Sequence, residues 1–364
     1  MIRLSLLQFR AQVVSAVITM VVYAAVLAAT GPHLASMYTA DGVGCHGGCH
    51  GGAAADYFTG SLIRTPYLVL YLLSVGIILL APAVIGLFWG APLIARELET
   101  GTDALAWNQS VTRTRWLAVK LTTGVVTAMA VTEALCLMQS WWAAPIGRAV
   151  GDGASGTVLA QGRFTQLVFD THGVTPLGYA AFAFTLGVTA GAVIRRTIPA
   201  MAVTLAIFAA LQVAMPLWIR PNLAPADHTV LSVASLGGVA EAQSGPGGTS
   251  FTLTALSVPG QPGAWLLSSG PVNAAGQATS STPAACTSVG TAGSGVGGKE
   301  SSNGPVPGAP SFVGCLASHS IRETITYQPA SRYWRFQATE TGIYLALALV
   351  LAGYCFRRLS RHLS

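Results

Sequence analysis

Six apolar runs divide this chain, and each is long enough to cross a lipid bilayer as a helix, which takes about 20 residues. Only 9% of the 364 residues are charged and 52% are hydrophobic, so a water-soluble globular domain is excluded. The pattern predicts an all-α polytopic membrane protein with six transmembrane helices. The expected spans are Gln12 to Thr30, Pro66 to Trp89, Leu117 to Trp142, Pro176 to Ile194, Pro199 to Ile219 and Tyr333 to Phe356.

Basic residues set the expected topology. Eleven of the 19 Lys and Arg residues fall in the termini, in the short intervals after the second and fourth spans, and at the start of the third span. Because cytoplasmic segments are enriched in Lys and Arg, we expect a plasma-membrane protein with both termini in the cytoplasm. The net charge of +6 does not indicate nucleic-acid binding, since the basic residues stand at span ends and not among aromatic residues. The eleven are Arg3, Arg10, Arg96, Arg113, Arg115, Lys120, Arg195, Arg196, Arg357, Arg358 and Arg361.

Three regions follow from this topology. Residues 1–219 should hold the first five spans, an N-terminal interfacial helix and a charged cytoplasmic loop over 91–116. Residues 220–331 form an extracellular β-containing insertion between the fifth and sixth spans, with a Gly/Ser-rich loop over 275–310. Residues 332–364 provide the sixth helix and a basic cytoplasmic tail. Within the insertion, strand-like composition marks Thr229 to Ser235, Ser250 to Val258 and Gly263 to Ser269.

Cysteines in the expected extracellular segments allow two different sites. A disulfide between Cys286 and Cys315 is favoured because disulfides persist outside the cytoplasm, with free thiols as the alternative. The run Cys45, His46, Gly47, Gly48, Cys49, His50 has ligand types that suit zinc or copper. Its spacing is not that of a standard zinc finger or haem attachment site, so a disulfide, a plain loop and a metal site all stay open.

Several residues inside the spans carry alternative interpretations. Gly187 and Gly191 form a small-xxx-small pair, which indicates close helix packing. Glu133 lies near the middle of the third span, where an acidic residue either forms a structural hydrogen bond or serves a transport path. Pro82 and Pro92 are expected to kink or end the second helix.

No catalytic constellation is visible. The sequence has no Gly-rich phosphate loop followed by Lys and Ser/Thr, and no nucleophile elbow. We therefore expect that this chain is not an enzyme and does not hydrolyse ATP by itself. An intramembrane enzyme built on Glu133 is disfavoured, because that carboxyl has no obvious partner set.

The chain resembles actinobacterial permease subunits of ABC-2 type exporters, which have six spans and a large outer segment before the last one. The resemblance covers most of the chain and is specific only in combination. The stretches that carry it are Gly90 to Thr102, Trp107 to Trp116 with Lys120, Phe169 to Pro176, Gly191 to Pro199, and Tyr327 to Gln337 with Glu340.

The resemblance implies a permease that works as two copies with two cytoplasmic ABC ATPase subunits, which bind the ATP and Mg²⁺. This chain would then hold no cofactor, apart from a metal at Cys45 to His50 if that loop binds one. The charged loop would couple ATPase closure to helix tilting, or else be only a solvated loop that sets topology. The expected coupling residues are Arg96, Glu97, Glu99, Asp103, Arg113 and Arg115.

The substrate path is expected between two permease copies, lined by the second and fifth spans. Aromatic and soft side chains with few charges favour an amphipathic or hydrophobic substrate. The competing function is a membrane-anchored binding or metal-sensing module that uses the Cys45 to His50 loop. The expected path residues are Tyr71, Phe88, Glu133, Phe208, Gln212 and Met215.

Overall fold

The computed structural model divides the chain into two compact units. The helical unit comprises Met1–Ala160, Thr165–Leu223 and Trp334–Ser364, and the strand unit comprises Gln161–Phe164 and Ala224–Tyr333. The expected interfacial helix before Arg10 lies outside the described residues. These are residues 10–44, 52–100, 113–152, 162–233, 238–245, 248–255, 258, 261, 263–286 and 312–361.

All six predicted spans are helices in the helical unit, and six helices of the described residues are long and apolar enough to cross a membrane. Two of the six spans contain a π-helical turn. The spans are α2 (Arg10–Gly44); α4 (Pro66–Ile85) with η1 (Gly86–Gly90) and α5 (Ala91–Thr100); α7 (Arg113–Trp142); α10 (Thr175–Ile194); α11 (Thr197–Ala214) with η2 (Met215–Ile219) and η3 (Arg220–Asn222); and α13 (Tyr333–Arg361). Shorter helices are α3 (Gly52–Ile63), α8 (Ala144–Gly151) and α9 (Gln166–Phe169).

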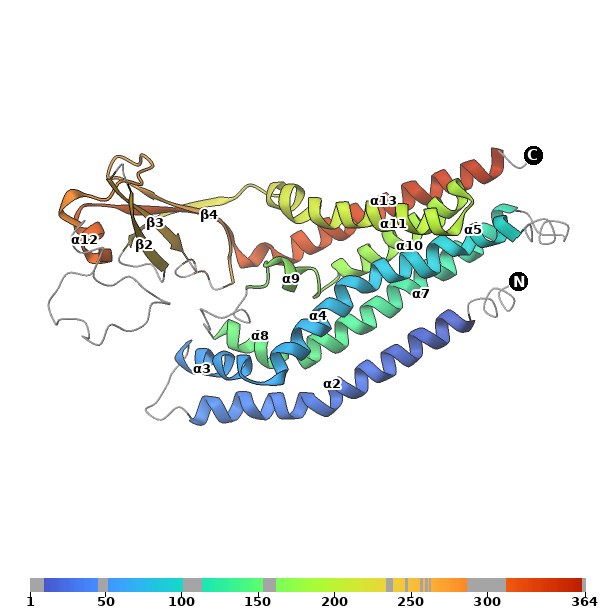
Figure 1. Ribbon diagram of the computed structural model, residues 1–364, viewed down its shortest axis with the longest axis horizontal. Coiled ribbons are helices and arrows are strands. Elements are labelled where there is room, and N and C mark those ends of the chain that lie inside the picture. The colour runs from blue at the N-terminus through green and yellow to red at the C-terminus, as the bar shows by residue number, and fades with distance from the viewer. Residues whose placement is uncertain are drawn as a thin grey trace. The chain divides into compact units, whose positions relative to one another are not determined.

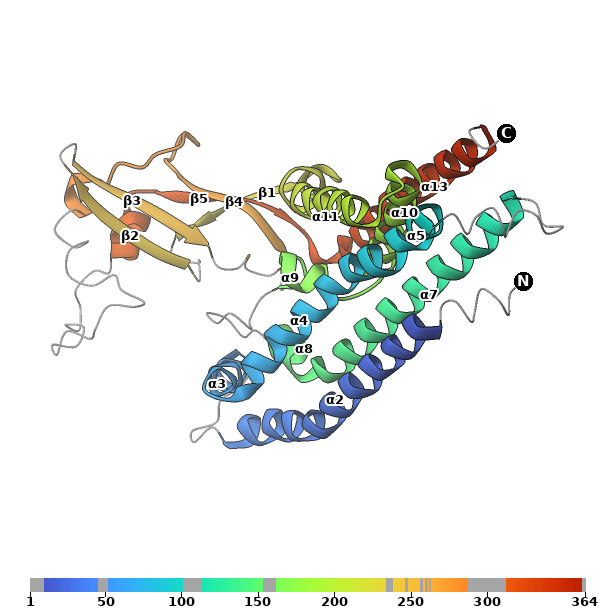
Figure 2. The ribbon, with the colours of Figure 1, turned by 45° about the vertical axis from the view of Figure 1, so that its right-hand side comes forward.

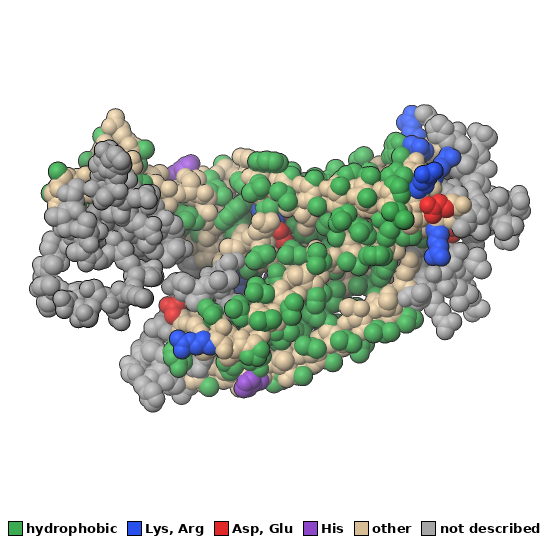
Figure 3. All heavy atoms as spheres, viewed as in Figure 1, with side chains coloured by type: hydrophobic (Ala, Val, Ile, Leu, Met, Phe, Trp, Pro, Cys, Tyr) green, Lys and Arg blue, Asp and Glu red, His purple; other side chains and the backbone are tan. Residues whose placement is uncertain are grey.

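The spans run side by side, as both ribbon views show (Figures 1 and 2). The start of α2, the helix α5, the start of α7 and the end of α13 lie at one end of this unit (Figures 1 and 2). Lys and Arg side chains gather at the same end (Figure 3). We call it the basic end; α3, α8 and α9 lie toward the opposite end.

The second span is longer than its apolar run, because neither of its prolines ends it. The helix passes through Pro82 and continues beyond Pro92 to Thr100. Between them, η1 replaces the usual i→i−4 pairing, and Ala91 N–H donates to the carbonyl of Gly86, five residues earlier. A π-turn of this kind accommodates a residue that lacks an N–H. Of the two outcomes expected for the prolines, a kink or an end of the helix, the structure excludes the end, since the helix continues to Thr100.

Helix α10 packs against the second span at very short range. A Cβ atom on Gly187 would stand 2.3 Å from the Gly86 carbonyl oxygen, and one on Gly90 would stand 2.6 Å from that of Phe184. On Gly191 it would stand 2.5 Å from the Ala91 oxygen. Only glycine fits where backbones approach this closely. This contact is the close packing that the small-xxx-small pair predicts.

The strand unit contains two small antiparallel sheets. Strand β5 (Arg322–Gln328) lies between β1 (Asp227–Ser232) and β4 (Trp265–Val272), while β2 (Gly238–Gly245) pairs with β3 (Gly248–Ala255). The three predicted strands correspond to β1, β3 and β4, whereas β2 and the central strand β5 were not predicted. Strand β5 reads Arg-Glu-Thr-Ile-Thr-Tyr-Gln and stands too close to the last apolar run to be separated from it by composition.

The described residues of the strand unit include a small apolar cluster. Val258 and Ile325 are buried, with Leu231, Leu266 and Tyr327 packed around them. Cys286 and Cys315 form the predicted disulfide, with Cα atoms 5.8 Å apart. The bond closes a chain segment of 29 residues, and such closure stabilises a fold by roughly 3 kcal/mol. The disulfide adds to the stability that this cluster gives the unit.

Replacing Gly187 by alanine should loosen the contact between α10 and the second span. The new methyl group meets backbone atoms, which cannot rotate away, so we expect a cost of about 1–3 kcal/mol in folding free energy. Thermal unfolding of the purified protein measures this as a lower midpoint. Gly76→Ala in α4 is the matched control, because its Cβ would meet no atom within 4 Å. Equal midpoints for the two variants would contradict the packing argument.

Candidate functional site

Helix α5 is fixed to α7 at the basic end by a partly buried ion pair. The Lys120 ammonium, on α7, pairs with the Glu97 carboxylate, and the two side chains are 3% and 21% exposed. The ammonium also lies 4.3 Å from the centre of the Trp116 ring, a cation–π contact. A cation this buried needs a carboxylate partner, so Glu97 is a structural residue as well as a predicted coupling residue.

A second carboxylate fixes α5 to α11. Glu99 Oε1 accepts a hydrogen bond of 2.8 Å from Thr197 N, and Glu99 Oε2 accepts one of 2.7 Å from the Thr197 hydroxyl. Thr197 begins α11, and its own N-cap residue, Arg196, makes no side-chain cap. Glu99 therefore supplies the acceptor and the negative charge that a helix N-terminus favours. These hydrogen bonds lower the pKa of the Glu99 carboxyl.

The remaining predicted coupling residues are Arg96, Asp103, Arg113 and Arg115. Arg96 on α5 and Arg115 on the first turn of α7 are exposed, at the basic end. Arg113 is the first residue of α7. Asp103 lies outside the described residues. The exposed arginines thus lie on two neighbouring helices at the basic end, and the two carboxylates of α5, Glu97 and Glu99, are engaged within the chain.

The predicted path residues do not line one surface of the single chain. Phe208 and Met215 are buried with Tyr179 and Tyr344 in one core cluster. Gln212 accepts a 3.0 Å hydrogen bond from the Tyr344 hydroxyl, which ties it to α13.

The other three predicted path residues lie elsewhere. Tyr71 belongs to a separate cluster with Tyr23 and Trp142. Phe88 is 57% exposed. Glu133, in α7, has one buried carboxylate oxygen without a hydrogen-bond partner.

A buried site with three charged side chains, within the part of the chain that the structure describes, was not predicted. Arg220 donates from Nε to Glu340 Oε2 over 2.9 Å and from Nη2 to Glu340 Oε1 over 3.0 Å. Its Nη2 also donates to Asp170 Oδ1. The Tyr179 hydroxyl lies 3.0 Å from Asp170 Oδ1 and 2.5 Å from Glu340 Oε1. We call these four residues the charge cluster; their exposed fractions are at most 4%.

The π-turn at the end of the fifth span turns Arg220 inward. The buried residues of α11 recur at Ala200, Thr204 and Phe208, and Met215 continues the same face. Pro216 follows Met215 and has no N–H to donate, and the Arg220 N–H bonds to the Met215 carbonyl, five residues back. The next buried position therefore comes five residues after Met215, which is Arg220. Its guanidinium lies 4.0 Å from the centre of the Phe169 ring.

Gln337 holds α13 against the turn that precedes α10. Its Oε1 accepts hydrogen bonds of 3.0 Å from Val174 N and from Thr175 N, at the start of α10. Its Nε2 donates to the Phe169 carbonyl over 2.9 Å and to the His172 carbonyl over 3.0 Å. One amide thus satisfies orphan groups at the end of α9 and the start of α10.

Gly173 makes room for this amide. It has φ of +79°, and a Cβ there would stand 2.7 Å from Gln337 Oε1. A side chain would be strained at this φ and would also displace the amide.

Part of the charge cluster could have been found from the sequence. Asp170 and Glu340 both stand in stretches that carry the family resemblance. No pattern in the sequence around either residue indicates that the two lie close together. Arg220 reads as the first residue of the outer segment, because a charge after an apolar run usually marks a span end. The structure instead places Arg220 in the helical unit, with partners 50 and 120 residues away in sequence.

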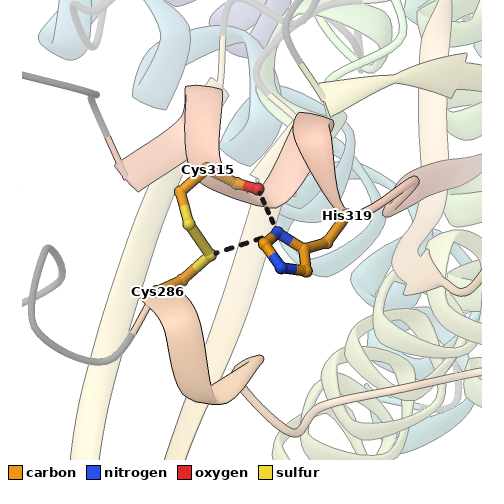
Figure 4. Close-up of side chains that lie close together, drawn as sticks. All are labelled: Cys286, Cys315 and His319. Carbon is orange, nitrogen blue, oxygen red and sulfur yellow. Dashed lines mark hydrogen bonds between the residues drawn. A yellow bond between two sulfur atoms is a disulfide. The ribbon is translucent and has the colours of Figure 1, made fainter.

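Among the described residues, one group has side chains of the kind that bind metals, in the strand unit. His319 Nδ1 lies 3.0 Å from the Cys315 carbonyl oxygen and 3.8 Å from Cys286 Sγ (Figure 4). Both sulfur atoms are used by the disulfide, so the group offers no thiolate ligand in this state. The predicted metal ligands, Cys45, His46, Cys49 and His50, lie outside the described residues.

Neutralising Glu97 should destabilise the helical unit. Glu97→Gln leaves the Lys120 ammonium buried without a carboxylate, which costs roughly 3 kcal/mol. Thermal unfolding should show a clearly lower midpoint, whereas Arg115→Gln, at an exposed position nearby, should change it little. If the two variants unfold at the same temperature, the ion pair does not hold α5.

Removing the cation of the charge cluster should have a larger effect. Arg220→Met leaves two buried carboxyls without their shared partner, and we expect a loss of about 3–5 kcal/mol in folding free energy. Arg335→Met, an exposed arginine on α13, is the matched control. Size-exclusion profiles and unfolding midpoints of both variants in detergent measure the difference; a stable Arg220→Met protein would argue against the cluster.

Comparison with known families identifies the helical part of the chain. A family model described as "ABC-2 membrane transporter related" matches residues 17–220, more than half of the 364 residues. The match begins within the first span and ends at Arg220, so it includes the second to fourth spans, helix α5 with its contacts to α7 and α11, and most of the fifth span. No curated protein and no solved structure matches the chain. With its six apolar helices, the chain is a multi-pass membrane protein, and it belongs to the ABC-2 membrane transporter related family.

Proposed function

We propose that this chain is the permease subunit of an ABC exporter and that a separate cytoplasmic ATPase subunit hydrolyses the ATP. Membership of the ABC-2 membrane transporter related family supports a permease. The absence of a phosphate-binding loop motif from the whole sequence supports a division of labour with another chain. In this proposal the permease binds no cofactor, and ATP and Mg²⁺ belong to the ATPase.

The observation that carries the proposal is the bracing of α5. A coupling element must move as one body with the spans, because a flexible loop would absorb the ATPase movement. Helix α5 continues the second span and is tied to α7 through Glu97 and Lys120 and to α11 through Glu99 and Thr197. A force on α5 therefore reaches three spans at once.

The orientation follows from charge. The basic end is cytoplasmic in this proposal, because Lys and Arg favour the cytoplasmic side. Both chain termini then lie in the cytoplasm. The strand unit is extracellular in this proposal, because it connects the end of the fifth span to the start of the sixth span, and both of these span ends are opposite to the basic end. The disulfide between Cys286 and Cys315 suits that compartment.

The transport path in this proposal runs between two copies of the permease and accepts an amphipathic or hydrophobic substrate. Phe88, Leu217 and Trp218 are exposed on the second and fifth spans and can form such a wall. Phe208, Gln212 and Met215 contact α10 or α13 within the chain, so in this proposal they pack behind the residues that line the path. Export is the direction that the resembling transporters favour.

The exposed arginines at the basic end test the ATPase contact without breaking the internal braces. Arg115→Glu reverses the charge where the ATPase should bind, and we expect copurification of the ATPase and its ATP turnover in membranes to fall at least several-fold. Arg148→Glu reverses an exposed charge on α8, toward the opposite end of the same unit, and should leave both unchanged.

The unfolding midpoint of each variant should equal that of the unmodified protein, which separates lost binding from lost folding. Normal assembly and turnover in Arg115→Glu, together with Arg96→Glu, would rule out this end as the ATPase contact.

A further inference from the structure

The charge cluster has one proton too few for its hydrogen bonds when both of its carboxylates are ionised. The Tyr179 hydroxyl lies within hydrogen-bond distance of both Asp170 Oδ1 and Glu340 Oε1, at 3.0 and 2.5 Å. A hydroxyl carries a single proton, and an ionised carboxylate can only accept. With both carboxylates ionised, one of these two oxygen–oxygen contacts has no proton between its atoms. A proton on either carboxyl completes both contacts, because the hydroxyl oxygen can accept it.

The net charge of the cluster also indicates that it binds one proton. Arg220 contributes one positive charge, and Asp170 and Glu340 contribute two negative charges when ionised. The side chains are 1%, 4% and 0% exposed, so the remaining negative charge would be buried away from water. An uncompensated buried charge is costly, and a group in this position takes up a proton instead. One proton makes the cluster neutral.

We propose that Asp170 and Glu340 form a binding site for a single proton, and that this proton sets how firmly α13 and the end of the fifth span are held on α9 and α10. The four residues come from the α9–α10 turn, α10, η3 and α13. Arg220 donates to both carboxyls. The Tyr179 hydroxyl accepts a hydrogen bond from the protonated carboxyl and donates one to the ionised carboxylate. When the proton leaves, the like charges of the two carboxylates push α13 away from the α9–α10 turn.

The titration of Asp170 agrees with this geometry. Burial raises the pKa of its carboxyl to about 6; Arg220 acts in the opposite direction and the Glu340 charge acts in the same direction. An unfolded aspartate has a pKa of about 3.9. The folded protein therefore binds the proton more tightly than the unfolded chain between these values. Stability from this site is present at low pH and is lost as the pH rises through about 6.

Other titratable groups surround the site. Tyr344 contacts Tyr179 edge to face, with ring centres 4.7 Å apart. His172 belongs to the same turn as Asp170, and its Nδ1 lies 3.0 Å from the Val168 carbonyl oxygen. On α7, the Cys136 thiol donates to the Thr171 carbonyl, and Glu133 lies one turn before it. His172 and Glu133 must be excluded in any test, because a histidine titrates near the same pH and a buried glutamate can also hold a proton.

Neutral isosteres test the site in the purified full-length protein. Asp170→Asn and Glu340→Gln each leave one carboxylate for Arg220, so the cluster is neutral without a bound proton. Between pH 4.5 and pH 7.5 the unfolding midpoint of the unmodified protein should fall by about 5 °C relative to either variant. His172→Asn should keep the pH dependence of the unmodified protein.

Infrared spectroscopy gives a second, direct measurement that does not depend on the folding of the cluster variants. In a Glu133→Gln protein, the carbonyl band of a protonated carboxylic acid should be present at pH 5.5 and absent at pH 8. Wherever Asp170→Asn or Glu340→Gln folds in that background, it should remove the titrating band. Absence of the band at pH 5.5 in the Glu133→Gln protein would overturn the proposal. So would parallel midpoint profiles for the unmodified protein and both isosteres.

Discussion

The backbone contact between α10 and the second span is the constraint on which the rest of the helical unit depends. Water cannot satisfy polar groups within a bilayer, and apolar burial does not draw helices together there, so spans associate by close packing. Gly86, Gly90, Gly187 and Gly191 allow two backbones to meet with no side chain between them. This contact places α5 directly beyond it, at the basic end. The other end of α10 then carries Tyr179 and the turn with Asp170.

Both ends of this arrangement use carboxylates to join helices that are distant in sequence. At the basic end, Glu97 and Glu99 reach α7 and α11 from a single helix. At the other end, Glu340 and Gln337 reach from α13 to η3 and to the α9–α10 turn. Such joining is what the proposed coupling to an ATPase requires. The same bonds make the polar residues structural, so their loss alone does not report on partner binding.

Much of the fold could be predicted from the sequence, because hydropathy and glycine spacing are local signals. The six spans, the disulfide and the close contact at Gly187 and Gly191 follow from such patterns. The charge cluster does not, since its three charged members come from three separate segments: Asp170 stands between two spans, Arg220 follows the fifth apolar run and Glu340 lies inside the sixth. Strand β5 was missed because Arg322–Gln328 stands next to the last apolar run and was not separated from it by composition.

The two π-turns explain why a span can be interrupted by proline and still deliver a residue to the right face. In η1 the Ala91 N–H reaches back to Gly86, and in η2 the Arg220 N–H reaches back to Met215. Each turn inserts one extra residue, which rotates everything after it by about 100° relative to an uninterrupted α-helix. After η1 this rotation keeps Ala91 and Ala95 on the α10 side, so that α5 stays packed as it leaves the apolar run. After η2 this rotation places Arg220 on the buried face of the fifth span, where its guanidinium contacts the carboxylates of Asp170 and Glu340.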